Sequence, residues 1–304
     1  MDVQTAWIAR PNVIGGLDHV GTQGPCILIY SQLIPGITNV TDRARYYSFY
    51  PWFLWSFDRR HQAAEHDRFI ELYRRADCLF TLIAERHARV NEGDSRVHGP
   101  AMVGRQKLTP AVTLLEAGQK VKLSTYAGLE DLGSRYFANP LGGLGQYYSG
   151  TLTHLQILDN TRGPWPNFTL EYGGPIARGF GSTVPEDKFW TAVEEDTITV
   201  ETLDALHAFC PCQMKRGGGE HEELLDVFFD RKDRYAEEGV QRRKTLALLL
   251  DLSSALQQAG AGDLDENAFR IGVYGRMPLA TMSQELRKFP RLPFGAAHLL
   301  GAAK

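Results

Sequence analysis

The densest run of apolar side chains lies between residues 38 and 57, in the string TNVTDRARYYSFYPWFLWSF. Thr38, Thr41 and Asp42 can each accept a hydrogen bond from a free backbone N–H group at a helix N-terminus. The aromatic side chains that follow fall on every face, which is typical of a helix surrounded by protein. The pattern predicts a buried central helix, kinked or restarted at Pro51. Its expected core side chains are Tyr46, Phe49, Trp52, Phe53 and Trp55.

A second pattern runs from Arg60 to about Val90, where apolar residues recur at three- and four-residue steps. This spacing places them on one face of a helix, with most charged residues on the other faces. The apolar positions are Phe69, Leu72, Tyr73, Ala76, Leu79, Phe80 and Ile83. We therefore expect a long amphipathic helix that packs beside the aromatic one.

Shorter helical segments, bounded by proline, glycine and capping residues, are predicted elsewhere. They cover residues 26–34, a segment opening at Thr109-Pro110, a segment ending near 158, and residues 199–209, 221–229, 242–258 and 266–274. Residues 160–188 lack a helical period and mark a candidate boundary. The predicted fold is mainly α, a compact multi-helix body with few short strands. It is divided into an N-terminal lobe at 1–160 and a C-terminal lobe at 161–304, or forms a single domain.

Composition changes this picture little. The chain has 304 residues, 43 % hydrophobic and 23 % charged, which is ordinary for a globular protein with ample length for a core. A net charge of −3 gives no global basic character that would attract DNA or an anionic membrane. Four cysteines are too few for a disulfide scaffold. Without a signal-peptide pattern or an apolar run of about 20 residues, we expect a cytoplasmic protein that does not enter a membrane.

The string LGGLG at residues 141–145 has the glycine content of a phosphate-binding loop. Such a loop needs a preceding strand and a defined motif, GxGxxG or GxxxxGK followed by Ser or Thr. Here the preceding string SRYFANP ends in a turn and no lysine follows. The glycines therefore favour close backbone packing over phosphate binding.

His207, Cys210, Cys212 and His221 form H-x2-C-x-C-x8-H, a candidate zinc set. The C-x-C spacing across Pro211 departs from the C-x2-4-C pairs usual for zinc, and apolar neighbours favour Cys210 as a small buried residue. We therefore expect no metal and no cofactor. The chain also lacks H-E-x-x-H and G-x-S-x-G, so no catalytic residue is predicted.

Four arginines adjoin the aromatic block: Arg43, Arg45, Arg59 and Arg60. Arginines among aromatic residues can form a nucleic-acid surface or a protein interface. The density of the aromatic side chains favours a third interpretation, a core helix whose arginines pair with buried carboxylates.

Two strings carry a family resemblance: ITNVTDRARYYSFYPWFLW at 37–55 and RYFANPLGGLGQYYSGTL at 135–152. They resemble a set of prokaryotic proteins encoded in anti-phage defence islands. Members of that set accompany SMC- or ABC-like ATPases and nuclease effectors, as in Lamassu-type or ABC three-component systems. The similarity covers about the N-terminal half, with a looser likeness at RRKTLALLLDL. It implies a non-catalytic accessory subunit that binds the ATPase and regulates the nuclease effector subunit.

An accessory subunit needs an apolar surface that its partner covers. Two stretches with little periodicity, residues 165–180 and 294–300, supply candidate residues for this interface. These residues are Trp165, Phe168, Phe180, Phe294, Leu299 and Leu300. A basic edge supplies candidate residues for contact with DNA that the partner binds. These residues are Arg242, Arg243, Lys244, Arg287, Lys288 and Arg291. Two alternatives remain: direct DNA contact within the complex, and a hydrolytic enzyme of unknown type.

Overall fold

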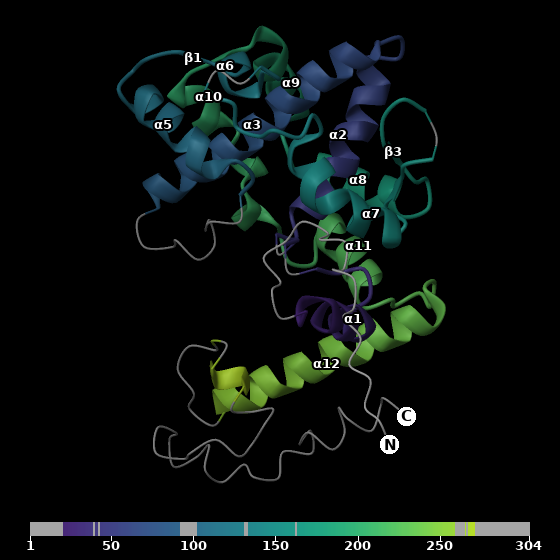
Figure 1. Cartoon of the computed structure of the whole chain (residues 1–304). Helices are drawn as coiled ribbons and strands as arrows, with labels where there is room; N and C mark the ends of the chain where they lie inside the picture. The colour runs from purple at the N-terminus through teal and green to yellow at the C-terminus, as the bar shows by residue number, and fades with distance from the viewer. Residues whose placement is uncertain are drawn as a thin grey trace, which may run out of the picture.

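The computed structural model describes residues 21–38, 40–41, 43–91, 102–130, 133–161, 163–258, 265 and 267–270. Within these ranges the chain is mainly helical, which confirms the predicted fold class (Figure 1). The α-helices are α1 (Gln23–Leu33), α2 (Tyr46–Arg60), α3 (His66–Val90), α5 (Arg105–Glu116), α6 (Ser124–Ala127), α7 (Ser149–His154), α8 (Gly173–Gly181), α9 (Glu186–Glu195), α10 (Val200–Ala205), α11 (Gly219–Phe228) and α12 (Ala236–Gln258). A π-helical turn, η1 (Leu144–Tyr148), and two 3₁₀ turns, η2 (His207–Phe209) and η3 (Pro211–Gln213), lie between them, and residues 267–270 are also helical.

Helix α2 lies at the centre of the core. Tyr46, Phe49, Trp52 and Phe53 are fully buried, as predicted, and Trp55 packs against the core from a partly exposed position. Rings from four other elements surround Trp52 and Phe53, which contact Phe180, Phe189, Phe209, Tyr73 and Trp190 at centroid distances of 5.1–5.5 Å. The helix is therefore enclosed by protein along most of its length, and its last turn, at Arg59 and Arg60, reaches the surface.

The start of α2 differs from the prediction. The helix begins at Tyr46, and the hydroxyl of Thr41 instead accepts from the Thr38 backbone N–H at 3.1 Å, within the preceding turn. Asp42 lies outside the described residues. The helix also runs through Pro51 without restarting, since only one backbone hydrogen bond depends on the missing N–H.

Helix α3 confirms the amphipathic pattern. Its apolar stripe, Phe69 to Ile83, is buried, and α5, α6, α9 and α10 pack around it (Figure 1). Helix α5 starts at Arg105 rather than at Thr109, so Pro110 lies inside a helix and not at its first position. Thr199 caps α10 through a capping box with Thr202.

The core extends across residue 160. Strand β2 (Leu158–Asp159) pairs antiparallel with β3 (Asn167–Phe168), and α8 packs directly against α2. A second small ladder joins β1 (Val121–Lys122) to β4 (Thr197–Ile198). One cluster of buried side chains contains residues from both halves of the chain. The core thus does not follow the expected boundary, and the division into two lobes stays a prediction.

Helices α1 and α12 lie together at one end of the molecule, below the aromatic core in Figure 1. The Thr245 hydroxyl of α12 donates to the carbonyl of Leu33, the last residue of α1, at 2.5 Å. Among the described residues, no helix has both the length and the apolar character that crossing a membrane requires.

Candidate functional site

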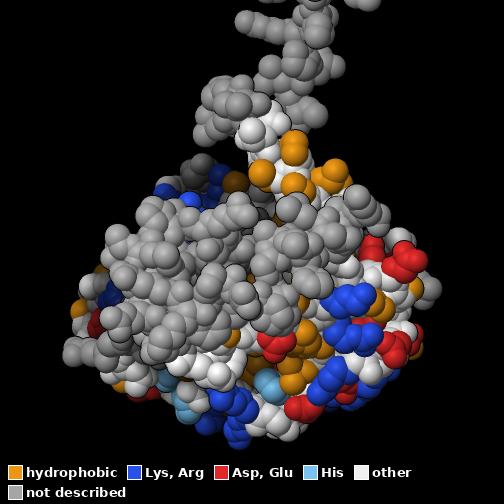
Figure 2. Space-filling view, turned by 90° about the horizontal axis from the view of Figure 1, so that it is seen from below, with side chains coloured by type: hydrophobic (Ala, Val, Ile, Leu, Met, Phe, Trp, Pro, Cys, Tyr) orange, Lys and Arg blue, Asp and Glu red, His pale blue; other side chains and the backbone are white. Residues whose placement is uncertain are grey.

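Helix α1 presents aliphatic side chains to solvent. Ile27, Leu28 and Ile29 are 57–59 % exposed, and no residue of the helix is buried. Its neighbour α12 also carries exposed apolar residues, with Leu249 40 % and Leu250 58 % exposed. Seen from this end of the molecule, orange hydrophobic side chains lie at the surface beside charged ones (Figure 2). We call these exposed residues of α1 and α12 the apolar end.

A buried arginine anchors this end to the rest of the fold. Arg242 on α12 donates to the carbonyls of Val227 and Phe228 at the end of α11, at 3.0 and 2.9 Å. It also donates to the carbonyl of Pro35, just after α1, at 2.9 Å. The last carbonyls of a helix lack intrahelical partners, so one guanidinium group satisfies acceptors on two segments at once. Burial lowers the pKa of Arg242, because removing the guanidinium group from water disfavours its charged form.

The expected DNA contact through Arg242 is therefore wrong, since its side chain is fully buried and bonded to protein. Arg243 donates to the Asp230 carbonyl at 2.7 Å and to an Asp233 carboxylate oxygen at 2.9 Å. Lys244 is exposed. The other three members of the predicted basic edge lie outside the residues that the structure describes. They are Arg287, Lys288 and Arg291.

The expected place of Phe180 in a partner interface is also corrected. Phe180 is fully buried, because it fills the core between Trp52 and Phe209 at centroid distances of 5.2 and 5.6 Å. Trp165 stacks on Phe69 at 4.7 Å, and Phe168 packs partly buried against the same core. Phe294, Leu299 and Leu300 lie outside the described residues.

Sequence reasoning missed α1 as a surface element. Its signal is the uninterrupted run CILIY at residues 26–30, which is apolar at consecutive positions. In a short helix such a run puts apolar side chains on every face, so part of it stays exposed unless protein surrounds it. The run predicts a short helix but does not indicate which element covers it.

Arg45 forms a buried ion pair directly before α2. Its Nε lies 3.0 Å from a carboxylate oxygen of Glu220 on α11, and its Nη1 donates to the Cys210 carbonyl at 2.6 Å. Burial lowers the pKa of Arg45, while the Glu220 carboxylate opposes that shift. The prediction that an arginine of this block pairs with a buried carboxylate is confirmed for Arg45.

The LGGLG string packs closely, as predicted. A Cβ atom at Gly142 would lie 2.2 Å from the Tyr136 hydroxyl oxygen, and one at Gly143 would lie 2.3 Å from Val103. The absence of side chains lets the backbone N–H of Gly143 donate to the buried carboxylate of Asp77 at 3.2 Å. Tyr136 and Tyr50 donate to the same carboxylate at 2.9 and 3.3 Å.

A hollow of about 420 Å³ lies between α3 and α6, lined by Ile70, Leu129 and Pro140 among others. Its two arginines are already engaged. Arg75 pairs with Glu71 at 2.5 Å and Asp196 at 3.2 Å, while Arg74 donates to backbone carbonyls. These cations hold the walls together, so the hollow suits a small apolar molecule better than an anion.

The four residues of H-x2-C-x-C-x8-H do not meet at one point. Cys210 and Cys212 lie side by side, with their Sγ atoms 3.4 Å apart. His221 instead accepts from the Gly217 N–H at 3.3 Å and lies beside Glu222. The histidine that joins the two sulfur atoms is His87 on α3, whose Nδ1 is 3.3 Å from Cys212 Sγ. His87 is 125 residues from Cys212 along the chain, so no local spacing could have indicated it.

Comparison with protein-family models, with curated proteins and with solved structures finds no match to this chain.

Proposed function

We propose that this chain is an accessory subunit of a multi-protein anti-phage defence complex, and that it docks on its partner through the apolar end. The observation that carries the proposal is the exposure of Ile27, Leu28 and Ile29 on a helix that buries none of its residues. Covering apolar surface stabilises an assembly by about 25 cal/mol per Å². Exposed apolar patches rimmed by polar residues mark interaction sites in proteins of this kind.

The resemblance at residues 37–55 and 135–152 supports the choice of partner, an SMC- or ABC-like ATPase of the same defence system. A short apolar helix suits a groove on a partner, where side chains one helical turn apart act as anchors. In this proposal the subunit works in the cytoplasm, regulates the nuclease effector, and catalyses no reaction of its own.

The test is co-expression with an SMC- or ABC-like ATPase from the same gene neighbourhood, as the proposal requires, followed by affinity purification at high salt. Replacing Ile27 and Ile29 by glutamate puts charges at two exposed positions on different sides of α1 without touching the core, so co-purification should be lost. Gln32→Glu adds a charge at an exposed polar position of the same helix and serves as the matched control.

Co-purification that is equally strong for the Ile27→Glu/Ile29→Glu variant would show that α1 is not the docking surface. A wild-type chain that binds no neighbour yet shifts DNA alone at physiological salt would replace this proposal with the DNA-contacting alternative.

A further inference from the structure

The end of α3 and the two 3₁₀ turns after α10 bring together the donor atoms of three residues. They are His87 Nδ1, Cys210 Sγ and Cys212 Sγ, and all three atoms lie within 4.8 Å of one another. Cys210 has an extended backbone with φ −56° and ψ 140°, and Pro211 then starts η3. This change of direction between the two cysteines brings their sulfur atoms to the same side, facing the last turn of α3.

We propose that His87, Cys210 and Cys212 bind a zinc ion. Zinc–sulfur bonds of about 2.3 Å and zinc–nitrogen bonds of about 2.0 Å in a tetrahedron separate two sulfur ligands by about 3.8 Å and a sulfur from a nitrogen by about 3.5 Å. The corresponding distances here are 3.4 and 3.3 Å. These two separations lie within a few tenths of an ångström of the tetrahedral values. The third, from Cys210 Sγ to His87 Nδ1, is at most 4.8 Å, so a small movement of the side chains completes the site.

The charge balance around the sulfur atoms favours a dication. Cys210 is fully buried, and a thiolate there is poorly solvated unless a cation lies beside it. A zinc ion supplies the missing positive charge, and its binding releases the thiol protons. Two thiolates and one neutral imidazole then make a site with no net charge, beside the balanced pair of Arg45 and Glu220.

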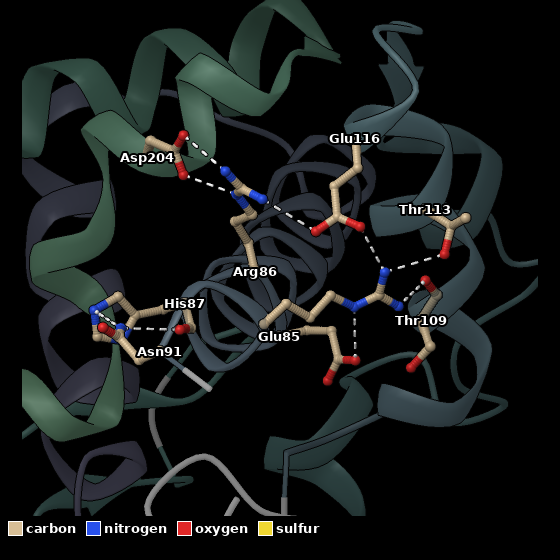
Figure 3. Close-up of polar contacts among 9 residues, drawn as sticks. Glu85, Arg86, His87, Asn91, Thr109, Thr113, Glu116 and Asp204 are labelled. Carbon is tan, nitrogen blue, oxygen red and sulfur yellow. Dashed lines mark hydrogen bonds and ion pairs between the residues drawn. The ribbon is translucent and has the colours of Figure 1, made fainter. Parts of the chain in front are cut away.

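Side-chain amides lie beside both kinds of ligand. Gln213 Nε2 donates to Cys212 Sγ at 3.3 Å, an interaction that stabilises a thiolate. Asn91 Nδ2 lies 2.9 Å from His87 Nε2, and Figure 3 shows it beside the ring. With Nδ1 bound to the metal, Nε2 would carry the proton. The Asn91 amide, whose Nδ2 also donates to the His87 carbonyl at 3.0 Å, would then have to turn its oxygen toward Nε2.

The sequence set included His207, which lies next to this group rather than within it. Its ring is 6.4 Å from that of His87, and its Nδ1 is 3.0 Å from the Asp204 carbonyl. Both histidines line a hollow of about 240 Å³. Three protein ligands of the Cys2His type leave a fourth position on zinc for water, as in sites with an open coordination position.

Elemental analysis of the full chain, purified without a metal-affinity step, tests the proposal. We expect about one zinc ion per chain in the wild type. Zinc should fall to background in His87→Ala and in Cys212→Ser, and it should be retained in His221→Ala. His221 is the matched control because it belongs to the sequence pattern but lies away from the sulfur atoms. Far-UV circular dichroism identifies any variant that has failed to fold.

Cobalt(II) titration of the metal-free wild type needs no substitution. A tetrahedral site with two thiolates gives thiolate-to-cobalt charge-transfer absorption, and zinc should abolish it by displacement. A wild type with neither bound zinc nor this absorption would overturn the proposal. A chain that loses zinc in His221→Ala but keeps it in His87→Ala would also overturn it, in favour of a different ligand set.

Discussion

At the scale of single residues, buried arginines join separate segments through backbone carbonyls. Arg74 donates to five of them, on Ala127, Gly128, Phe137, Asn139 and Pro140. Arg242 does the same for α11 and the chain after α1. Loops and helix ends leave carbonyls without N–H partners, and a planar guanidinium group has enough donors to satisfy several. These arginines therefore hold the fold together from within.

Arg242→Ala should lower the free energy of unfolding by about 3 kcal/mol, because it leaves buried carbonyls without donors. Arg243→Ala, the matched control one position away, removes an ion pair in which Asp233 is 75 % exposed. Its cost should stay below about 1 kcal/mol. Urea unfolding at an unchanged m-value measures both. Equal losses in the two variants would contradict the bonding role of Arg242.

Asp77 gives the fold a pH dependence of known sign. Burial raises the pKa of its carboxyl group to about 6, opposed by donors from Tyr136, Gly143 and Tyr50 and by the nearby charge of Arg74. The folded state thus holds this proton more tightly than the unfolded state. The resulting stability is present below about pH 4 and is lost as the pH rises through about 6.

Asp77→Asn should remove this contribution. Between about pH 4 and pH 6.5 the wild type should lose about 2–3 kcal/mol relative to the variant, from the difference between the two pKa values. Chemical unfolding of both proteins across this range measures the difference. A difference in stability that stays constant with pH would show that Asp77 keeps an ordinary pKa.

At the scale of elements, α2 determines the stability of the core. Trp52→Ala or Phe53→Ala should destabilise the protein by about 3–5 kcal/mol, the range for removing a large buried side chain. Trp55→Ala is the matched control on the same helix, since Trp55 is partly exposed and stacks on Arg59 at 4.3 Å. Thermal and urea unfolding measure all three variants. Unchanged melting temperatures for both core variants would contradict the central place of α2.

Local pattern predicted α2, α3 and the close packing of the LGGLG string, because each depends on residues near one another in the chain. It failed where burial depends on distant contacts. Phe180 lies in a segment without helical periodicity and Arg242 in a basic run, and both patterns suggest a surface position. In the structure, side chains of α2 contact Phe180, and carbonyls of α11 accept from Arg242. The predicted set of cysteines and histidines was wrong for the same reason, since the histidine beside Cys212 is His87, which comes from a distant helix. For α1 the local run CILIY indicates apolar side chains on every face, but which of them stay exposed depends on the neighbouring elements.

At the scale of the whole molecule, the apolar end should make the isolated chain self-associate. Apolar contacts are not screened by salt, and sulfate strengthens them. Sedimentation velocity of the wild type should therefore show larger species as sulfate concentration rises, while Leu28→Glu should sediment as a monomer. A wild type that stays monomeric throughout, or a Leu28→Glu variant that associates equally, would contradict a role for α1 in association.

The ion pair of Arg45 with Glu220 also has a consequence for synthesis, since the two residues are 175 positions apart. A ribosome adds about 5–20 residues per second, so roughly 10–35 s separate the appearance of α2 from that of its partner on α11. The rings around Trp52, those of Phe180, Phe189 and Phe209, also emerge after α2. During this interval the aromatic side chains of α2 have no core to cover them, and Arg45 has no carboxylate partner. We therefore expect a ribosome-associated chaperone to bind this part of the nascent chain.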